Sequence, residues 1–221
     1  MSLQDFAMAV VDSMMAALPR PVPGRAALER CKIISHRGEH DNKSVMENTL
    51  QAFEKARSAG VWGIEGDIRW TADLVPVICH DPSPVRVFGV ADAISSLTFD
   101  QLRARVPAIP SLEEVICNFG GNTHLMLELK AEPWPEPARQ RDILRSLLAP
   151  LVPVQDYHML ALDPALFTAL DFLPNESFLY LVSFLLRDRP MRGGKREHSS
   201  DHDTVESTRL TGTRSVRASP S

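Results

Sequence analysis

The sequence lacks the features that mark several large classes of protein. No apolar run approaches the roughly 20 residues that a membrane-spanning helix needs. Residues 1–18 are apolar but contain no Lys or Arg, so they lack the basic region that opens a secretory signal peptide. The net charge of −4 does not favour nucleic acid or an anionic membrane. We therefore expect a cytoplasmic protein that binds a small molecule rather than nucleic acid or lipid bilayer.

Cysteine is also scarce. The three cysteines form an odd count, and no Cys-x-x-Cys pair is present. Cys79 lies within an apolar strand, and Cys117 lies near the end of an apolar helix. We expect buried free thiols, as in a reducing compartment.

Strands and helices alternate after an N-terminal helix and Pro-rich connector in residues 1–30. Short apolar runs predict the strands, and periodic segments with capping residues predict the helices. The order indicates a parallel sheet with helices outside it, either as a barrel or as an open doubly wound sheet. No Gly-x-Gly-x-x-Gly follows the first strand, which weakens the nucleotide-binding doubly wound alternative. The predicted strands are 32–35, 61–68, 75–79, 125–129, 157–162 and 178–184; the predicted helices are 47–59, 98–105, 111–118, 137–148 and 164–172.

The link between the second and third strands is too short for a crossover helix. A hairpin centred on Asp73 and Leu74 would place Asp67 opposite His80, whereas an extended return would make the two strands parallel. Both geometries bring His80 towards Asp67.

Carboxylates follow two of the apolar strands. Glu65 and Asp67 are two residues apart, a spacing that points both side chains to the same face of a strand. Two such carboxylates repel each other unless a proton or a cation neutralises them, and Ca²⁺ or Mg²⁺ prefers oxygen ligands of this kind. Glu128, at the end of a later strand, is a candidate third ligand. The alternative for such a pair is a solvated strand edge.

Histidines and basic residues end the same strands. His36 and His80 are candidates for general acid and base, although a lone strand histidine is more often a core residue. Arg37 and Lys130 suit a phosphate group beside a metal site. The alternative for both cations is salt bridges to the nearby carboxylates.

An ordered set of motifs between Ile33 and Lys130 resembles the glycerophosphodiester phosphodiesterase family, within the phospholipase-C-like barrel phosphodiesterases. Each motif is modest alone, but the order is specific, and a weaker likeness continues to about Phe184. The motifs are His36-Arg37-Gly38, Glu47-Asn48-Thr49 with Ala52-Phe53, Glu65-x-Asp67, Thr71-x-Asp73, Pro76-Val77, His80-Asp81, Ile109 to Glu114, and Glu128-Leu129-Lys130.

The resemblance implies a TIM-type (β/α)8 barrel that hydrolyses glycerophosphodiesters to sn-glycerol 3-phosphate and an alcohol. A related lyase or phospholipase that forms a cyclic phosphate is a further alternative. Three groups of residues take roles by this likeness: Glu65, Asp67 and Glu128 hold Ca²⁺ or Mg²⁺, His36 and His80 act as the acid/base pair, and Arg37 and Lys130 contact the phosphate.

The sequence departs from the family pattern in three ways. Met46 stands where proline is usual, and Leu74 stands where a turn glycine is usual. A position of positive φ would cost leucine about 1 kcal/mol. A TIM barrel needs eight strands, but the incomplete barrel domain, residues 31–186, supplies about six before a polar, disordered tail in 187–221. We expect a C-terminally truncated barrel, through a frameshift or alternative exon. The alternative to an active enzyme is a truncated, catalytically silent relative that is unstable or acts only by binding a partner.

Overall fold

The computed structural model describes residues 22–181. Their strands are β1 (Ile34–His36), β2 (Gly63–Trp70), β3 (Pro76–Ile78), β4 (His124–Leu129), β5 (Tyr157–Ala161) and β6 (Phe178–Tyr180). Their α-helices are α2 (Arg25–Glu29), α3 (Leu50–Ser58), α4 (Val85–Phe88), α5 (Phe99–Arg105), α6 (Leu112–Phe119) and α7 (Pro137–Leu148). Short 3-10 helices are η1 (Ile94–Ser96), η2 (Pro164–Ala169) and η3 (Asn175–Ser177).

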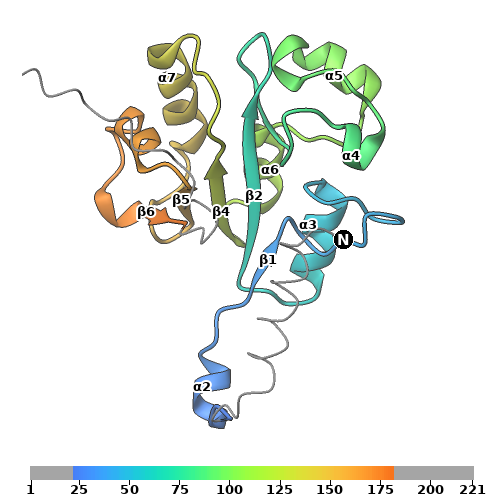
Figure 1. The fold of residues 1–221 in the computed structure, drawn as a ribbon. Helices are drawn as coiled ribbons and strands as arrows, with labels where there is room; N and C mark the ends of the chain where they lie inside the picture. Colours follow the sequence, from blue (N-terminus) through green and yellow to red (C-terminus); the bar gives the residue numbers. More distant parts are fainter. Residues whose placement is uncertain (1–21, 182–221) are drawn as a thin grey trace, which may run out of the picture. The chain divides into compact units, whose positions relative to one another are not determined.

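The six strands form one sheet with the order β1-β2-β4-β5-β6, and β3 pairs with β2. All neighbours along the path are parallel, as the alternation of strands and helices predicted. The sheet is the parallel part of a barrel, so the predicted TIM-type fold is confirmed for these strands (Figure 1). Because the strands are parallel, their carboxyl ends meet along one edge of the sheet.

The link between β2 and β3 is a hairpin, so the parallel alternative is wrong. The antiparallel register pairs Ile68 with Ile78, and the Cys79 amide donates to the Asp67 carbonyl. The hairpin therefore places Cys79, not His80, opposite Asp67. Leu74 at its turn has φ 64°, the left-handed conformation in which leucine replaces the more usual glycine.

Two apolar clusters hold the sheet and its helices together. The larger one lies between the sheet and α3, α6 and α7, with Phe53, Phe119 and Leu144 among its buried members. The smaller one joins Val77 and Cys79 of the hairpin to the segment that contains η1 and α5, which lies beside the hairpin in Figure 1. The segment after β3 thus has apolar contacts of its own that fix its position.

Local signals in the sequence account for most helix boundaries. Thr98 and Ser111 form the capping boxes of α5 and α6, and α7 has the predicted bounds Pro137–Leu148. The predicted helix 164–172 is wrong, since η2 is a 3-10 helix that ends at Ala169.

The cysteine prediction is confirmed only in part. All three cysteines are free thiols, but Cys31 and Cys117 are exposed and only Cys79 is buried. Burial raises the pKa of the Cys79 thiol to about 12.

Some predictions fall outside the described residues. These are the helix in residues 1–18, the end of the strand predicted over 178–184, and the tail in 187–221. Among residues 22–181, no helix is long and apolar enough to cross a membrane.

Candidate active site

The side chains predicted to do chemistry lie within or directly after β1, β2, β3 and β4, and because β3 is antiparallel its end returns to the middle of β2. The register pairs His36 with Glu65 and Asp67 with Glu128, so these four residues share one face of the sheet. A tight turn begins directly after β1. Gly38 has φ 80° there, and a Cβ atom on it would lie 2.7 Å from the backbone of the next helix, α3.

Glu65, Asp67 and Glu128 form one buried cluster of carboxylates. Each offers an oxygen atom, and these oxygen atoms all lie within 4.8 Å of one another. The exposed fractions are 6%, 0% and 6% in the same order. The predicted grouping of the three acids is therefore present, and the alternative of a solvated strand edge is wrong.

Lys130 neutralises part of this cluster. Its Nζ lies 2.6 Å from Asp67 Oδ1 and 2.8 Å from Glu128 Oε1. Burial opposes ionisation of Asp67, but the ammonium and a hydrogen bond from Asn48 Nδ2 at 2.7 Å lower its pKa overall. Lys130 is thus held by carboxylates, as its alternative interpretation predicted.

Glu65 is the least neutralised member of the cluster. Burial, followed by the Asp67 charge, raises its pKa from 4.5 to about 8. Its Oε2 accepts a hydrogen bond from the Arg37 amide at 3.1 Å, but its buried Oε1 has no hydrogen-bond partner within residues 22–181. A buried acceptor with no donor, beside two other carboxylates, fits a hard divalent cation such as Ca²⁺ or Mg²⁺.

His36 and Arg37 approach the cluster from β1. His36 Nε2 lies 3.7 Å from Glu65 Oε2, and the His36 side chain is 70% exposed. Partial burial and the adjacent Arg37 charge lower the pKa of His36. Arg37 has φ 58°, and its guanidinium lies between Glu47, at 3.0 Å, and Asp67, at 3.5 Å.

His80 follows β3 and belongs to a separate hydrogen-bonded group. Its Nδ1 lies 2.7 Å from Asp81 Oδ1. Within residues 22–181, no hydrogen bond or ion pair joins the His80 ring to Glu65, Asp67 or Glu128; its partner there is Asp81. The Arg69 guanidinium also donates two hydrogen bonds, at 2.8 and 2.7 Å, to the His80 carbonyl oxygen.

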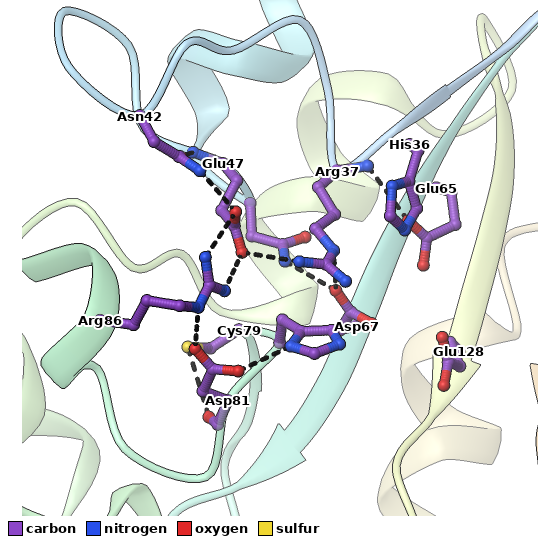
Figure 2. A network of polar contacts seen from close by, with 12 residues as sticks. His36, Arg37, Asn42, Glu47, Glu65, Asp67, Cys79, Asp81, Arg86 and Glu128 are labelled. Carbon is purple, nitrogen blue, oxygen red and sulfur yellow. Dashed lines mark hydrogen bonds and ion pairs between the residues drawn. The ribbon is translucent and has the colours of Figure 1, made fainter. Parts of the chain in front are cut away.

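Several residues that complete this arrangement had no predicted role. Glu47 and Asn48 stand in a family motif, so the resemblance could have identified them. Arg69 pairs with Glu132 at 2.6 Å, and Arg86 pairs with both Glu47 and Asp81, as Figure 2 shows for Arg86. No spacing in the sequence marks these two arginines, because their partners are distant along the chain or in irregular segments.

One protein family recurs in the comparisons with known proteins. Residues 36–162 match the model of the glycerophosphoryl diester phosphodiesterase family. The chain is 31% identical over 183 residues to glycerophosphodiester phosphodiesterase 1 of Mus musculus, an alignment that covers 70% of this chain and 54% of that protein. It is 39% identical over 95 residues to the Homo sapiens protein of the same name, with 40% of this chain and 28% of that protein covered.

A solved structure gives the same result for the fold. The crystal structure of glycerophosphodiester phosphodiesterase from Thermotoga maritima superposes with a TM-score of 0.59 and 25% identity, over 71% of this chain and 64% of that one. The chain spans about half of the length of the mouse protein that it matches.

Proposed function

The chain belongs to the glycerophosphoryl diester phosphodiesterase family, and from that premise we propose that it hydrolyses glycerophosphodiesters to sn-glycerol 3-phosphate and an alcohol with a divalent cation. The observation that carries this proposal is the buried cluster of Glu65, Asp67 and Glu128, with an unpartnered oxygen on Glu65. We propose residues 31–186 as the catalytic domain and the cytoplasm as its location.

Glu65, Asp67 and Glu128 would hold Ca²⁺ or Mg²⁺. Such a cation, when bound, neutralises phosphate oxygens and the charge that develops on them during hydrolysis. The position of Lys130 supports this role, because it shows that the cluster accommodates positive charge. Arg37 and Lys130 would contact the phosphate of the substrate, after exchanging part of their present carboxylate contacts for it.

His36 and His80 would move the protons. One would take a proton from the attacking hydroxyl, from water or the substrate's own glycerol, and the other would give one to the leaving oxygen. His80 is prepared for such a task, because the ionised Asp81 only accepts hydrogen bonds and so fixes the hydrogen of His80 on Nδ1. Nε2 of His80 is then the nitrogen left for the substrate.

A catalytically silent relative that only binds a partner is a second candidate. It is favoured by the contacts of Lys130 and Arg37, whose charged groups are engaged by Asp67, Glu128 and Glu47. A binding protein needs no exchangeable cation, so this candidate predicts ligand binding without turnover.

The test is release of sn-glycerol 3-phosphate from glycerophosphocholine by the purified full chain, measured with a coupled enzyme assay. We expect release with Ca²⁺ or Mg²⁺, none in EDTA, and none from the D67N variant. Asp100 lies exposed in the first turn of α5, so D100N serves as the matched control and should retain the rate. Folded wild-type protein that stays inactive with both cations on several head groups would support the silent candidate.

A further inference from the structure

Arg86 occupies an unusual place between two parts of the candidate site. It lies in α4, a four-residue helix of the segment after β3, and its side chain is 45% exposed. One side of its guanidinium meets Asp81, with Nε 2.5 Å from Oδ2. The other side meets Glu47 at two points, 2.5 Å from Nη2 to Oε1 and 3.1 Å from Nη1 to Oε2.

Each of these carboxylates holds a residue of the proposed chemistry. Asp81 accepts the Nδ1 hydrogen of His80 at 2.7 Å, and Glu47 accepts a hydrogen bond from Arg37 Nη1 at 3.0 Å. The result is a continuous series of contacts from His80 through Asp81, Arg86 and Glu47 to Arg37. Figure 2 shows Arg86 between Asp81 and Glu47, and Glu47 beside Arg37.

We propose that Arg86 is a positioning residue for the proposed reaction: it fixes Asp81 and Glu47, and through them the orientation of the His80 ring and of the Arg37 guanidinium. This inference rests on the proposed function for its catalytic consequence, but not for its structural one. Within residues 22–181 the side-chain partners of Arg86 are Asp81 and Glu47, neither of which belongs to the carboxylate cluster.

The burial of Glu47 and the geometry of its contact with Arg86 distinguish this contact from an ordinary surface ion pair. The Glu47 side chain is 4% exposed, and a carboxylate so buried needs partners for its charge. The contact with Arg86 is bidentate, the arrangement that an Arg fork makes with a carboxylate and that Lys cannot copy. Asn42 holds Glu47 from a further side, with Nδ2 2.7 Å from Oε2, so the carboxylate has one defined orientation.

The protonation of these groups agrees with the contacts. Burial opposes ionisation of Glu47, but Arg86, Asn42 and Arg37 outweigh it and lower its pKa to about 2. Asp81 is also held ionised, since His80 and Arg86 outweigh the effect of burial and lower its pKa. The two carboxylates therefore remain acceptors across the neutral range.

The first measurement reports on the ring of His80 without any need for turnover. In protein labelled with ¹⁵N in its histidine rings, the signals of His80, assigned with H80Q, should show hydrogen on Nδ1. In R86Q, Asp81 loses the guanidinium that holds it, and we expect the His80 ring to shift towards the Nε2–H tautomer. The tautomer population in R86K should lie between those of the wild type and R86Q. R105Q is the matched control, because Arg105 pairs with Asp92 in the same segment at 44% exposure, and it should match the wild type.

The second measurement tests the catalytic consequence with glycerophosphocholine and a divalent cation. We expect R86Q and D81N each to lower kcat/KM about 10- to 100-fold, the range that a misplaced catalytic group produces. The R86Q/D81N double variant should be no more than about threefold below the worse single variant, because both substitutions break the same series of contacts. R105Q should keep the wild-type rate.

The outcomes separate this inference from the proposed function. An inactive wild type would contradict the function, while the ring signals of R86Q would still decide the role of Arg86. An active wild type with unchanged ring signals and rate in R86Q, or with multiplying effects in the double variant, would overturn the positioning role and leave the function standing. If R86Q does not fold, D81N and R86K give the same comparison.

Discussion

Replacing Lys130 with methionine removes the ammonium that neutralises the buried carboxylate cluster. Lys130 Nζ lies 2.6 Å from Asp67 and 2.8 Å from Glu128, and its side chain is 10% exposed. Methionine keeps the length of the stem but leaves Glu65, Asp67 and Glu128 with too little positive charge. We expect K130M to be markedly less stable than the wild type in EDTA at neutral pH.

The size of the effect follows from the burial of the pair. Removing one partner of a buried ion pair costs about 3–5 kcal/mol, and proton uptake by a neighbouring carboxylate limits that cost. We take about 3 kcal/mol at pH 8, which corresponds to a fall in Tm of roughly 6–12 °C for a protein of this size. The assay is thermal unfolding followed by circular dichroism, in EDTA and again with Ca²⁺ or Mg²⁺.

A divalent cation should restore part of the loss, because it can replace the missing ammonium. The gain in Tm on adding the cation should be larger for K130M than for the wild type. Lys55 is an exposed residue of α3, so K55M is the control and should change the free energy of unfolding by no more than about 0.5 kcal/mol. Equal melting of K130M and wild type in EDTA, or equal gains on adding the cation, would refute the reasoning.

Four further predictions concern single residues. The pKa of Glu65 is raised from 4.5 to about 8. In EDTA, the contribution of this carboxyl group to stability is therefore present below pH 4.5 and is lost as pH rises through 8. In urea unfolding, the free energy of unfolding of the wild type minus that of E65Q should fall by a few kcal/mol over that window. H36Q and H80Q should each lower kcat about 10²- to 10⁴-fold in steady-state assays, with Tm little changed. L74G relieves the strain of leucine at a φ of 64°, which is worth about 1–2 kcal/mol. It also loses the burial of a side chain that is 4% exposed, worth about 1.5–3 kcal/mol, and adds a flexible glycine. Chemical denaturation should therefore show a lower free energy of unfolding for L74G than for the wild type. G38A places a Cβ atom 2.7 Å from backbone at φ 80°, so its Tm should fall, and an unchanged Tm would contradict the tight turn described after β1.

The sequence was sufficient for the parallel sheet and for the carboxylate cluster. Both follow from periodicities: two residues on one strand face placed Glu65 beside Asp67, and the parallel order brought Glu128 to the same edge. Capping residues were equally informative for α5 and α6, because a cap is a local interaction.

Predictions failed where distant contacts decide the structure. The helix expected from Glu47 begins only at Leu50, because Asn48 takes φ 56° and directs its amide to Asp67. Asp67 faces Cys79 rather than His80 because the hairpin register differs by one residue from the expected one. The arginine that joins Glu47 to Asp81 could not be predicted, since no repeat or spacing relates these three positions.

The central claim is that the carboxylate cluster, loaded with a divalent cation, supports hydrolysis of a glycerophosphodiester. The most direct test is a ³¹P NMR time course of glycerophosphocholine with the purified full chain, first in EDTA and then after addition of excess Ca²⁺ or Mg²⁺. We predict that the diester signal persists in EDTA and then gives way to that of glycerol 3-phosphate, with no cyclic phosphate accumulating. A diester signal that persists after the cation is added, or that decays equally in EDTA, would contradict the account.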